Sequence, residues 1–221
     1  MCGSEAAARV IGPKTVAESL TIDNGLNRGE WGPIQVCSQG AYVFAFEIKY
    51  SGVGFVDDTS VNAIRLYCET PTGSLTDLIT SSEGSYGQWR GMRACPHGAM
   101  MTGMRANVVP DMGVLGDDLG IDNLQMKCAG GEILDGQHGV PNMSGQDSLV
   151  TRELTQVGNR EMEAVHMKIR QSADARDYGD WGLWKACSPG NKVCGLETRL
   201  QDGHTLEDDA GLTDVIMYCC N

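Results

Sequence analysis

The segment LEDDAGLTDVIMYCCN (206–221) joins a pair of aspartates to an apolar run that ends in two adjacent cysteines. The same arrangement occurs twice more in the chain. In every copy a tryptophan stands six residues before one cysteine, and the second aspartate stands ten residues before another. The shared positions are Trp31, Cys37, Asp57, Asp58 and Cys68; Trp89, Cys95, Asp117, Asp118 and Cys128; and Trp181, Cys187, Asp208, Asp209 and Cys219. This spacing predicts three internal repeats, about 20–84, 85–177 and 178–221, in one domain spanning 1–221.

Alternating apolar residues predict two strands in each repeat. In the first repeat Tyr42, Phe44, Phe46 and Ile48 alternate with smaller or polar residues, which predicts a half-buried strand with these four side chains on one face. A second alternating run follows each aspartate pair. Its apolar positions are Ile64, Leu66 and Cys68; Leu124, Met126 and Cys128; and Val215, Met217 and Cys219. Three small antiparallel sheets can bury their apolar faces only against one another, so we expect an all-β prism.

Composition and charge exclude several classes of protein. Twenty-nine glycines and few aromatic residues favour short strands joined by tight turns. The formal net charge of −12 would repel a phosphate backbone, so no nucleic acid is expected as a partner, whereas cationic proteins remain possible partners. The longest clean apolar run, Ala41 to Phe46, is far too short to span a membrane.

The nine cysteines indicate disulfides rather than a metal centre. The sequence has no Cys-x-x-Cys pair, and its four histidines lack the spacing of zinc ligands. These histidines are His97, His138, His166 and His204. No cofactor is therefore expected. Paired cysteines imply an oxidising compartment, and because MCGSEAAARV (1–10) lacks the apolar core of a signal peptide, we expect the chain to follow a removed leader.

Four disulfides are predicted from the repeat. Within each copy the first and last shared cysteines close a loop of about 32 residues, which contributes roughly 3 to 4 kcal/mol in the chain-entropy model. These pairs are Cys37 with Cys68, Cys95 with Cys128, and Cys187 with Cys219. Cys194 stands where Phe44 stands in the first copy, so it is expected to point inward and to reach Cys220. The swapped pairing, Cys187 with Cys220 and Cys194 with Cys219, stays open, and Cys2 is left odd.

The triplicate W-x5-C, the segment DDTSVNAIRLYC (57–68), and CGLET (194–198) followed by YCC (218–220) resemble the vitelline membrane outer layer protein 1 family. The resemblance covers about residues 20–128 and 178–221. It implies a secreted β-prism of three Greek-key sheets with pseudo-threefold symmetry, of the kind found in egg coats and other secretions. Members are regarded mainly as structural, with a weak transfer activity on N-acetylglucosamine oligosaccharides, and no catalytic residue can be carried over.

An insertion of roughly 30 residues within 129–177 departs from that family. It contains the sequon Asn142-Met143-Ser144, which predicts N-glycosylation of Asn142 in a surface loop. Val165, Met167 and Ile169 alternate with charged residues or histidine and favour an additional strand, with a helix as the alternative.

The repeated aspartates are interpreted first as turn residues. Because an active site is normally unique, a residue present in every copy more often serves a turn that every copy shares, and Asp can cap such a turn with its own carboxylate. Binding of sugar or calcium by these residues is the alternative. The residues are Asp57, Asp58, Asp117, Asp118, Asp208 and Asp209.

The repeated tryptophans are interpreted as wedges in the common core, with stacking on sugar rings as the alternative. They are Trp31, Trp89 and Trp181. Trp184 belongs to one copy only, so it is the better candidate for an exposed ring, although local packing is its simpler explanation. In the second copy Met92, Met100, Met101 and Met104 suit either core filling or a pocket for an apolar ligand.

Together these patterns predict a secreted, disulfide-stabilised structural or carbohydrate-associated binding protein of an extracellular coat or fluid, with glycans or coat proteins as partners. A carrier of a lipid or pigment is the alternative. A weak transferase acting on N-acetylglucosamine oligosaccharides is the second alternative, although no catalytic residue is indicated and a non-enzymatic role is favoured.

Overall fold

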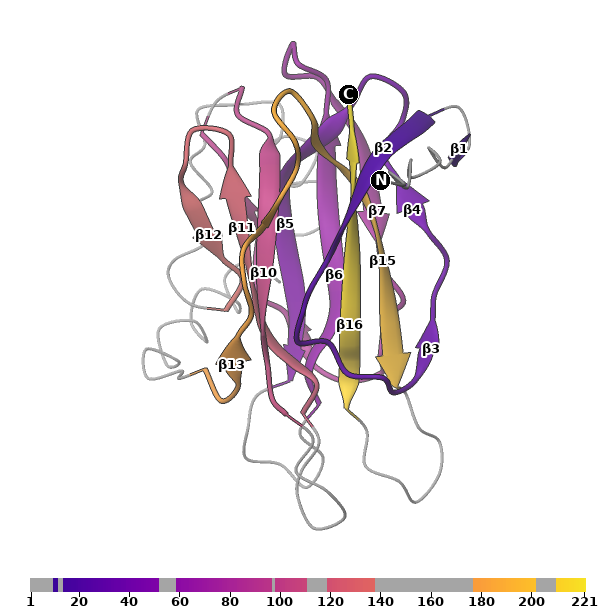
Figure 1. Cartoon of the computed structure of the whole chain (residues 1–221), viewed down its shortest axis with the longest axis vertical. Helices are drawn as coiled ribbons and strands as arrows, with labels where there is room; N and C mark the ends of the chain where they lie inside the picture. Colours follow the sequence, from indigo (N-terminus) through magenta and orange to yellow (C-terminus); the bar gives the residue numbers. More distant parts are fainter. Residues whose placement is uncertain are drawn as a thin grey trace, which may run out of the picture.

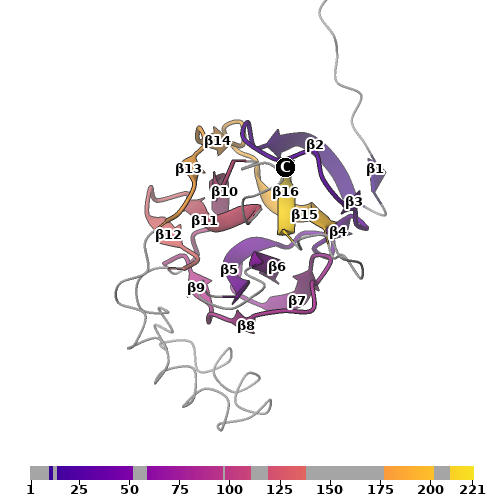
Figure 2. The ribbon, with the colours of Figure 1, turned by 90° about the horizontal axis from the view of Figure 1, so that it is seen from below.

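The computed structural model describes residues 10–11, 14–51, 59–96, 98–110, 119–137, 177–201 and 210–221. The regular structure in these ranges consists of β-strands in three antiparallel sheets. Viewed along the column, the three groups of strands surround a common centre (Figure 2). The longest strands run along the column, and the C-terminus lies at one of its ends (Figure 1).

Each sheet is named here after its first long strand. The β5 sheet contains β5 (Tyr42–Ser51), β6 (Ser60–Glu69), β7 (Leu75–Thr80), β8 (Gln88–Trp89) and β9 (Arg93–Ala94). The β10 sheet contains β10 (Met101–Val108), β11 (Ile121–Cys128), β12 (Ile133–Asp135), β13 (Asp180–Trp181) and β14 (Lys185–Ala186). The β15 sheet contains β15 (Lys192–Gln201), β16 (Gly211–Cys220), β1 (Val10–Ile11), β2 (Lys14–Thr21), β3 (Glu30–Trp31) and β4 (Gln35–Val36).

Every sheet is completed by strands from another part of the chain. The short strands β8 and β9 precede β10 in the chain but pair with β5. In the same way β13 and β14 precede β15 but pair with β10, and β3 and β4 precede β5 but pair with β15. The first strand of each pair carries the repeated tryptophan. The N-terminal strand β2 closes the ring by pairing with the C-terminal strand β16, with Val16 opposite Cys220. The predicted all-β prism of three Greek-key sheets with pseudo-threefold symmetry is thereby confirmed.

The central core lies between the three sheets and takes apolar side chains from all of them. Its largest fully buried members are Phe46, Ile48, Ile64, Leu66, Met101, Met104, Ile121, Leu124, Met126, Leu196, Leu212 and Met217. A second, smaller cluster contains Phe44, Tyr67, Cys194, Tyr218 and Cys220 among others. Burial of apolar area at these positions is the main favourable contribution to folding.

A β-bulge at the same position of each sheet changes which side chains face the central core. The pairing register shifts between Val43 and Ala45, and it does so at the equivalent positions of β10 and β15. Because an extra residue reverses the alternation, Phe44 lies in the second cluster while Phe46 lies in the central core. The prediction that Tyr42 and Phe44 share one face with Phe46 and Ile48 is therefore wrong. So is the inward orientation predicted for Cys194, which also lies in the second cluster.

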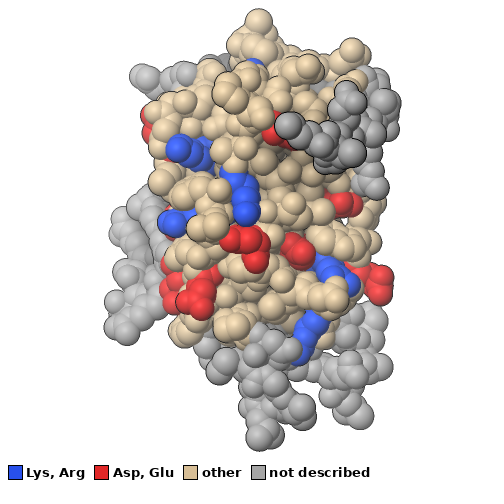
Figure 3. Space-filling model, in the orientation of Figure 1, with Lys and Arg blue, Asp and Glu red and all other residues tan. Residues whose placement is uncertain are grey.

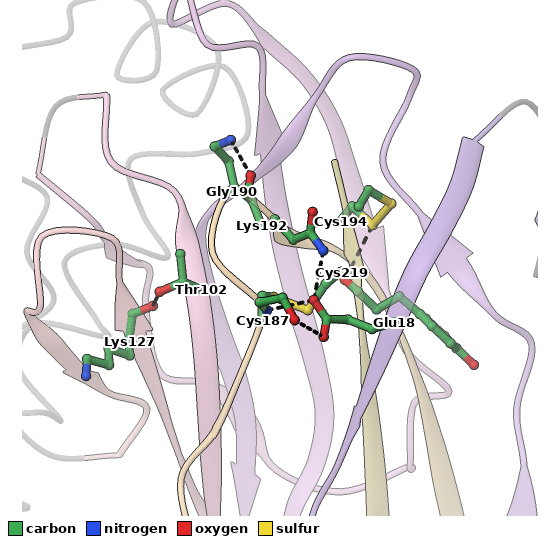
Figure 4. Close-up of a disulfide and its surroundings, with 12 residues drawn as sticks. Glu18, Thr102, Lys127, Cys187, Gly190, Lys192, Cys194 and Cys219 are labelled. Atoms are coloured by element: carbon green, nitrogen blue, oxygen red, sulfur yellow. Dashed lines mark hydrogen bonds between the residues drawn. A yellow bond between two sulfur atoms is a disulfide. The ribbon is translucent and has the colours of Figure 1, made fainter. Parts of the chain in front are cut away.

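Four disulfides brace the sheets. They join Cys37 to Cys68, Cys95 to Cys128, Cys187 to Cys219 and Cys194 to Cys220. Neighbouring residues of a strand face opposite sides, so Cys219 contributes to the central core and Cys220 to the second cluster. The two adjacent cysteines thus fasten both faces of the last strand, and Figure 4 shows Cys187, Cys194 and Cys219 close together.

Hydrogen bonds between a serine and a carboxylate fasten two of the three corners between sheets. The backbone N–H and the hydroxyl of Ser38 donate to the two oxygens of Asp77 on β7, at 2.8 and 2.6 Å. The same groups of Ser188 donate to Glu18 on β2, at 2.7 and 2.9 Å, where Glu18 reaches the loop after Cys187 (Figure 4). Burial raises the pKa of Glu18, but hydrogen bonds from Asn191 and Ser188 outweigh it, and the net pKa is lowered.

The third corner has a different fastening because Pro96 occupies the serine's place. Proline has no N–H and no hydroxyl, so it cannot form the same pair of bonds. Here the buried Arg93 on β9 donates from Nε to the carbonyl oxygen of Asp135 on β12, at 3.0 Å. Burial lowers the pKa of Arg93 to about 10. All three corners therefore carry a polar link between two sheets.

Close backbone contacts join the three sheets where β6, β11 and β16 begin. The residue two positions after each aspartate pair has a left-handed backbone, with φ of 48° at Ser60, 58° at Gly120 and 64° at Gly211. A Cβ atom on Gly211 would lie 2.3 Å from the carbonyl oxygen of Thr59 in another sheet. Position 211 therefore needs glycine for two reasons, its left-handed φ and the short distance between these two backbone segments.

Alanine substitutions can separate these two requirements. Gly40 also has a left-handed φ, of 79°, but its Cβ would meet nothing within 4 Å. We expect Gly40→Ala to lower the free energy of unfolding by about 1 kcal/mol and Gly211→Ala by about 3 kcal/mol or more, because the latter also overlaps a backbone oxygen. Urea denaturation of the oxidised protein measures both values, and equal losses would contradict the proposed contact between sheets.

Candidate functional site

Several predicted site residues lie outside the described residues. These are the six repeated aspartates, Asp57, Asp58, Asp117, Asp118, Asp208 and Asp209, together with Asn142 and Cys2. Their proposed roles stay predictions. The tryptophans and methionines can be placed.

The repeated tryptophans are not core wedges, and that prediction is wrong. Trp31 is 40% exposed, and Trp89 and Trp181 are partly exposed. Each belongs to a two-residue strand at the side of a sheet, and each ring lies beneath an arginine of that sheet. The distance from the guanidinium carbon to the ring centre is 6.0 Å for Arg199 and Trp31, 3.8 Å for Arg65 and Trp89, and 4.6 Å for Arg105 and Trp181. Cation–π stacking rather than core packing therefore holds these rings.

The methionines of the second copy are buried. Met92 and Met100 lie in the second cluster, and Met101 and Met104 lie in the central core with no exposed area. Their flexible side chains fill space between sheets, which is the first of the two roles predicted for them. An apolar ligand at these residues stays a prediction.

The β10 sheet differs from the others because its arginine stacks on two indoles. The guanidinium carbon of Arg105 lies 4.9 Å from the ring centre of Trp184 as well as 4.6 Å from that of Trp181. Nε of Arg105 donates to Oε1 of Gln125 at 2.9 Å. Among the described residues no acceptor is assigned to its terminal nitrogens, which therefore remain able to donate to a ligand.

Fixed hydrogen bonds extend from this arginine across the sheet. Gln125 donates to Asp135 at 2.7 Å, and Asn123 donates to both Asp135 and Asp177 at 3.0 and 2.9 Å. The indole Nε1 of Trp181 donates to Asp177 at 3.0 Å. We call the six residues Arg105, Gln125, Asp135, Asp177, Trp181 and Trp184 the tryptophan–arginine site. Its planar polar groups are held in one orientation beside two flat aromatic rings.

Comparison with the other two sheets indicates that this arrangement is specific to β10. At the position of Arg105 the other sheets carry Glu47 and Glu197, each of which accepts a hydrogen bond from a tyrosine, Tyr67 or Tyr218. The β10 sheet has Lys127 in the tyrosine's place. It therefore presents cationic side chains where the other sheets bury a neutral hydroxyl against a carboxylate. On the face of the column in Figure 3, acidic and basic side chains are interspersed rather than gathered by sign.

Sequence reasoning identified Trp181 and Trp184 but missed Arg105, Gln125, Asp135 and Asp177. These four come from β10, β11, β12 and the segment before β13, and no fixed spacing links them. One signal was present in the sequence, because Arg105 is the one charged residue in the segment MTGMRANVV (101–109), on a predicted strand. The partner of Arg105, Gln125 on the neighbouring strand, is set by the register of the sheet and cannot be found from sequence spacing.

A buried carboxylate lies at the end of the β10 sheet next to this site. Asp122 has no exposed area, and it accepts hydrogen bonds from the Tyr178 N–H at 2.9 Å and the Tyr50 hydroxyl at 3.2 Å. Burial raises the pKa of Asp122, the hydrogen bonds oppose this, and the nearby charge of Asp177 adds to the rise.

The raised pKa makes stability depend on pH. Because the folded pKa lies above the ordinary value of 3.8, the folded state favours protonated Asp122. This contribution is complete below that value and is lost as pH rises through the raised pKa. We expect Asp122→Asn, which is neutral at every pH, to gain stability relative to the wild type over that window and to level off above it. Urea titrations across pH measure this difference. The exposed Asp180→Asn is the control, and an identical pH profile for both variants would contradict the expectation.

Within the described ranges no group of three or more His, Cys, Asp or Glu side chains is placed to hold a metal ion. Over the same ranges there is no helix with the length and apolar character needed to cross a membrane.

Comparison with known structures shows similarity to β-prism lectins. The mannose-binding lectin from Champedak superposes with a TM-score of 0.50 at 6% identity, covering 96% of this chain and 100% of the lectin. Artocarpin complexed with methyl-α-mannose gives a TM-score of 0.50 at 7% identity, covering 93% and 99%. At such low identity the likeness shows the fold alone.

Comparison of sequences identifies the family. The vitelline membrane outer layer protein 1 homolog of Mus musculus is 26% identical over 223 residues, covering 100% of this chain and 92% of the homolog. The homolog of Homo sapiens is 26% identical over 206 residues, covering 91% and 82%. The family model for Vitelline membrane outer layer protein I matches residues 18–147 and 140–221. The chain therefore belongs to the vitelline membrane outer layer protein I family.

Proposed function

We propose that this protein is a rigid carbohydrate-binding component of an extracellular coat or secreted fluid, and that it contacts glycan through the tryptophan–arginine site. The observation that carries the proposal is the stacking of Arg105 on two indoles, with Gln125 fixed beside it. Pyranose rings offer hydroxyls at their edges and C–H groups on their faces. Planar amide and guanidinium groups suit the hydroxyls, while aromatic rings suit the C–H faces.

The rigidity of the site supports the same role. Every polar side chain of the site is held by at least one hydrogen bond within the β10 sheet or its connections. A ligand therefore meets groups that are already oriented, which reduces the entropy lost on binding. Four disulfides favour an oxidising compartment, in agreement with an extracellular protein. The family's name, which refers to an egg coat, and the glycan ligands of the two lectins are consistent with this role.

Replacing the central arginine tests the proposal. We expect Arg105→Ala to weaken binding to the glycan retained best on an array by about tenfold or more, because charge-assisted hydrogen bonds contribute about 1.5 to 3 kcal/mol. The array should include oligomers of N-acetylglucosamine and mannosides, and affinities can be measured by surface-immobilised glycan titration. Arg199→Ala is the matched control, since Arg199 lies over Trp31 in the β15 sheet. Equal affinities for the two variants, or no glycan retained at all, would contradict the proposal.

A further inference from the structure

The third repeat alone contains two tryptophans separated by two residues. Its segment WGLWKAC (181–187) places Trp184 three residues after Trp181 and Cys187 three residues after that. At the place of Trp184 the other copies carry Ile34, in WGPIQVC (31–37), and Met92, in WRGMRAC (89–95). The chain thus holds one Trp-x-x-Trp segment and two equivalent segments that lack its second tryptophan.

The fold gives this pair of rings one shared partner. Trp181 and Trp184 are both partly exposed, and the guanidinium carbon of Arg105 lies 4.6 and 4.9 Å from their ring centres. The indole Nε1 of Trp181 donates to Asp177 at 3.0 Å. Cδ1 is bonded directly to Nε1 in the indole ring, so it lies at the same edge of Trp181 as this carboxylate.

We propose that Trp181 is a C-mannosylation site. This inference rests on the proposed function, because it requires the chain to pass through the secretory pathway. Mannosyltransferases of that pathway act on the first tryptophan of Trp-x-x-Trp segments, and their donor is a polyprenyl-phosphate-linked mannose. The ring of Trp181 is partly covered by Arg105 in the folded protein, so transfer takes place on the extended chain before the β10 sheet forms.

The reaction is a substitution at the sugar. The electron-rich indole Cδ1 attacks the anomeric carbon of the mannosyl donor and forms a carbon–carbon bond. The bond from that carbon to the phosphate oxygen breaks, and the lipid phosphate leaves with the electron pair. Cδ1 then loses its proton to a base of the transferase, which restores the aromatic ring. No oxidant or reductant is needed.

In the folded site the added sugar has a hydrogen-bond acceptor next to it. A mannose on Cδ1 of Trp181 lies beside Asp177, and a carboxylate has several lone pairs with which to accept hydrogen bonds from hydroxyls. The modification therefore adds a polar, hydroxyl-rich surface to the tryptophan–arginine site. It does so on the β10 sheet and not at the stacked rings of Trp31 and Trp89.

Peptide mass spectrometry of the full chain secreted from cultured mammalian cells tests the inference directly. We expect the Trp181 peptide to carry one hexose that resists amidase release of N-glycans and that fragments across the sugar ring, because the carbon–carbon link does not break as a glycoside does. Peptides with Trp31 and Trp89 are internal controls and should carry none. A secreted protein with unmodified Trp181, or a hexose lost as a whole unit, would overturn the inference.

Two variants test whether the spacing is responsible. Trp184→Leu should abolish the hexose on Trp181, and Met92→Trp should create a new one on Trp89. If either variant is retained in the cell, the peptide is analysed from the lysate, since transfer precedes folding. Persistence of the hexose in Trp184→Leu, or an unmodified Trp89 in Met92→Trp, would count against the inference. The two proposals can fail separately. Arg105→Ala tests glycan binding and leaves the Trp-x-x-Trp segment intact, whereas the hexose on Trp181 is read by mass spectrometry.

Discussion

The exchange of short strands between neighbouring sheets is the constraint on which this structure depends. Each sheet needs the tryptophan-bearing strands of another repeat to satisfy backbone hydrogen bonds on one side of its long strands. Each sheet also has an apolar face that only the other two can cover. Neither hydrogen bonding nor burial is complete within one repeat, so the three units form one cooperative structure. The disulfides and the corner hydrogen bonds fasten an arrangement that the backbone pairing has already defined.

The repeat was enough to predict the prism, because fixed spacing and alternation are properties of a single strand and its turns. What sequence reasoning could not predict depends on pairing between strands. The bulge at Phe44 and Cys194 reverses the side on which later residues face, and no residue type marks it. A large apolar residue that occurs in every copy predicts a place in the core, whereas Trp31, Trp89 and Trp181 lie on added strands beneath arginines. The site itself joins β10, β11, β12 and β13, and so it exists only in the assembled sheet.

Because the three sheets are related by pseudo-threefold symmetry, the β10 sheet can be compared position by position with the other two. Glu47 and Glu197 hold equivalent positions and have equivalent tyrosine partners, so they act as a reference for what the position does when it is structural. In the β10 sheet Arg105 stands in place of the glutamate, and its guanidinium group stacks on Trp181 and Trp184. A position that is constant in two repeats and different in the third is no longer explained by the shared fold. The divergence of the β10 sheet is thus the internal argument for a ligand there, independent of any relative.

The pairing of β2 with β16 also determines when the molecule can form. Val16 lies opposite Cys220, so the first long strand of the column bonds to the last one in the chain. During synthesis on the ribosome β2 emerges early, and the edge that pairs with β16 stays open until β16 has been made, although β1 can already pair with the other edge. Contacts so far apart in sequence slow folding, and a strand edge that is unpaired in the interval invites aggregation. Completion of the β15 sheet therefore waits for the synthesis of β16, and chaperones would have most to protect in the nascent chain before that point.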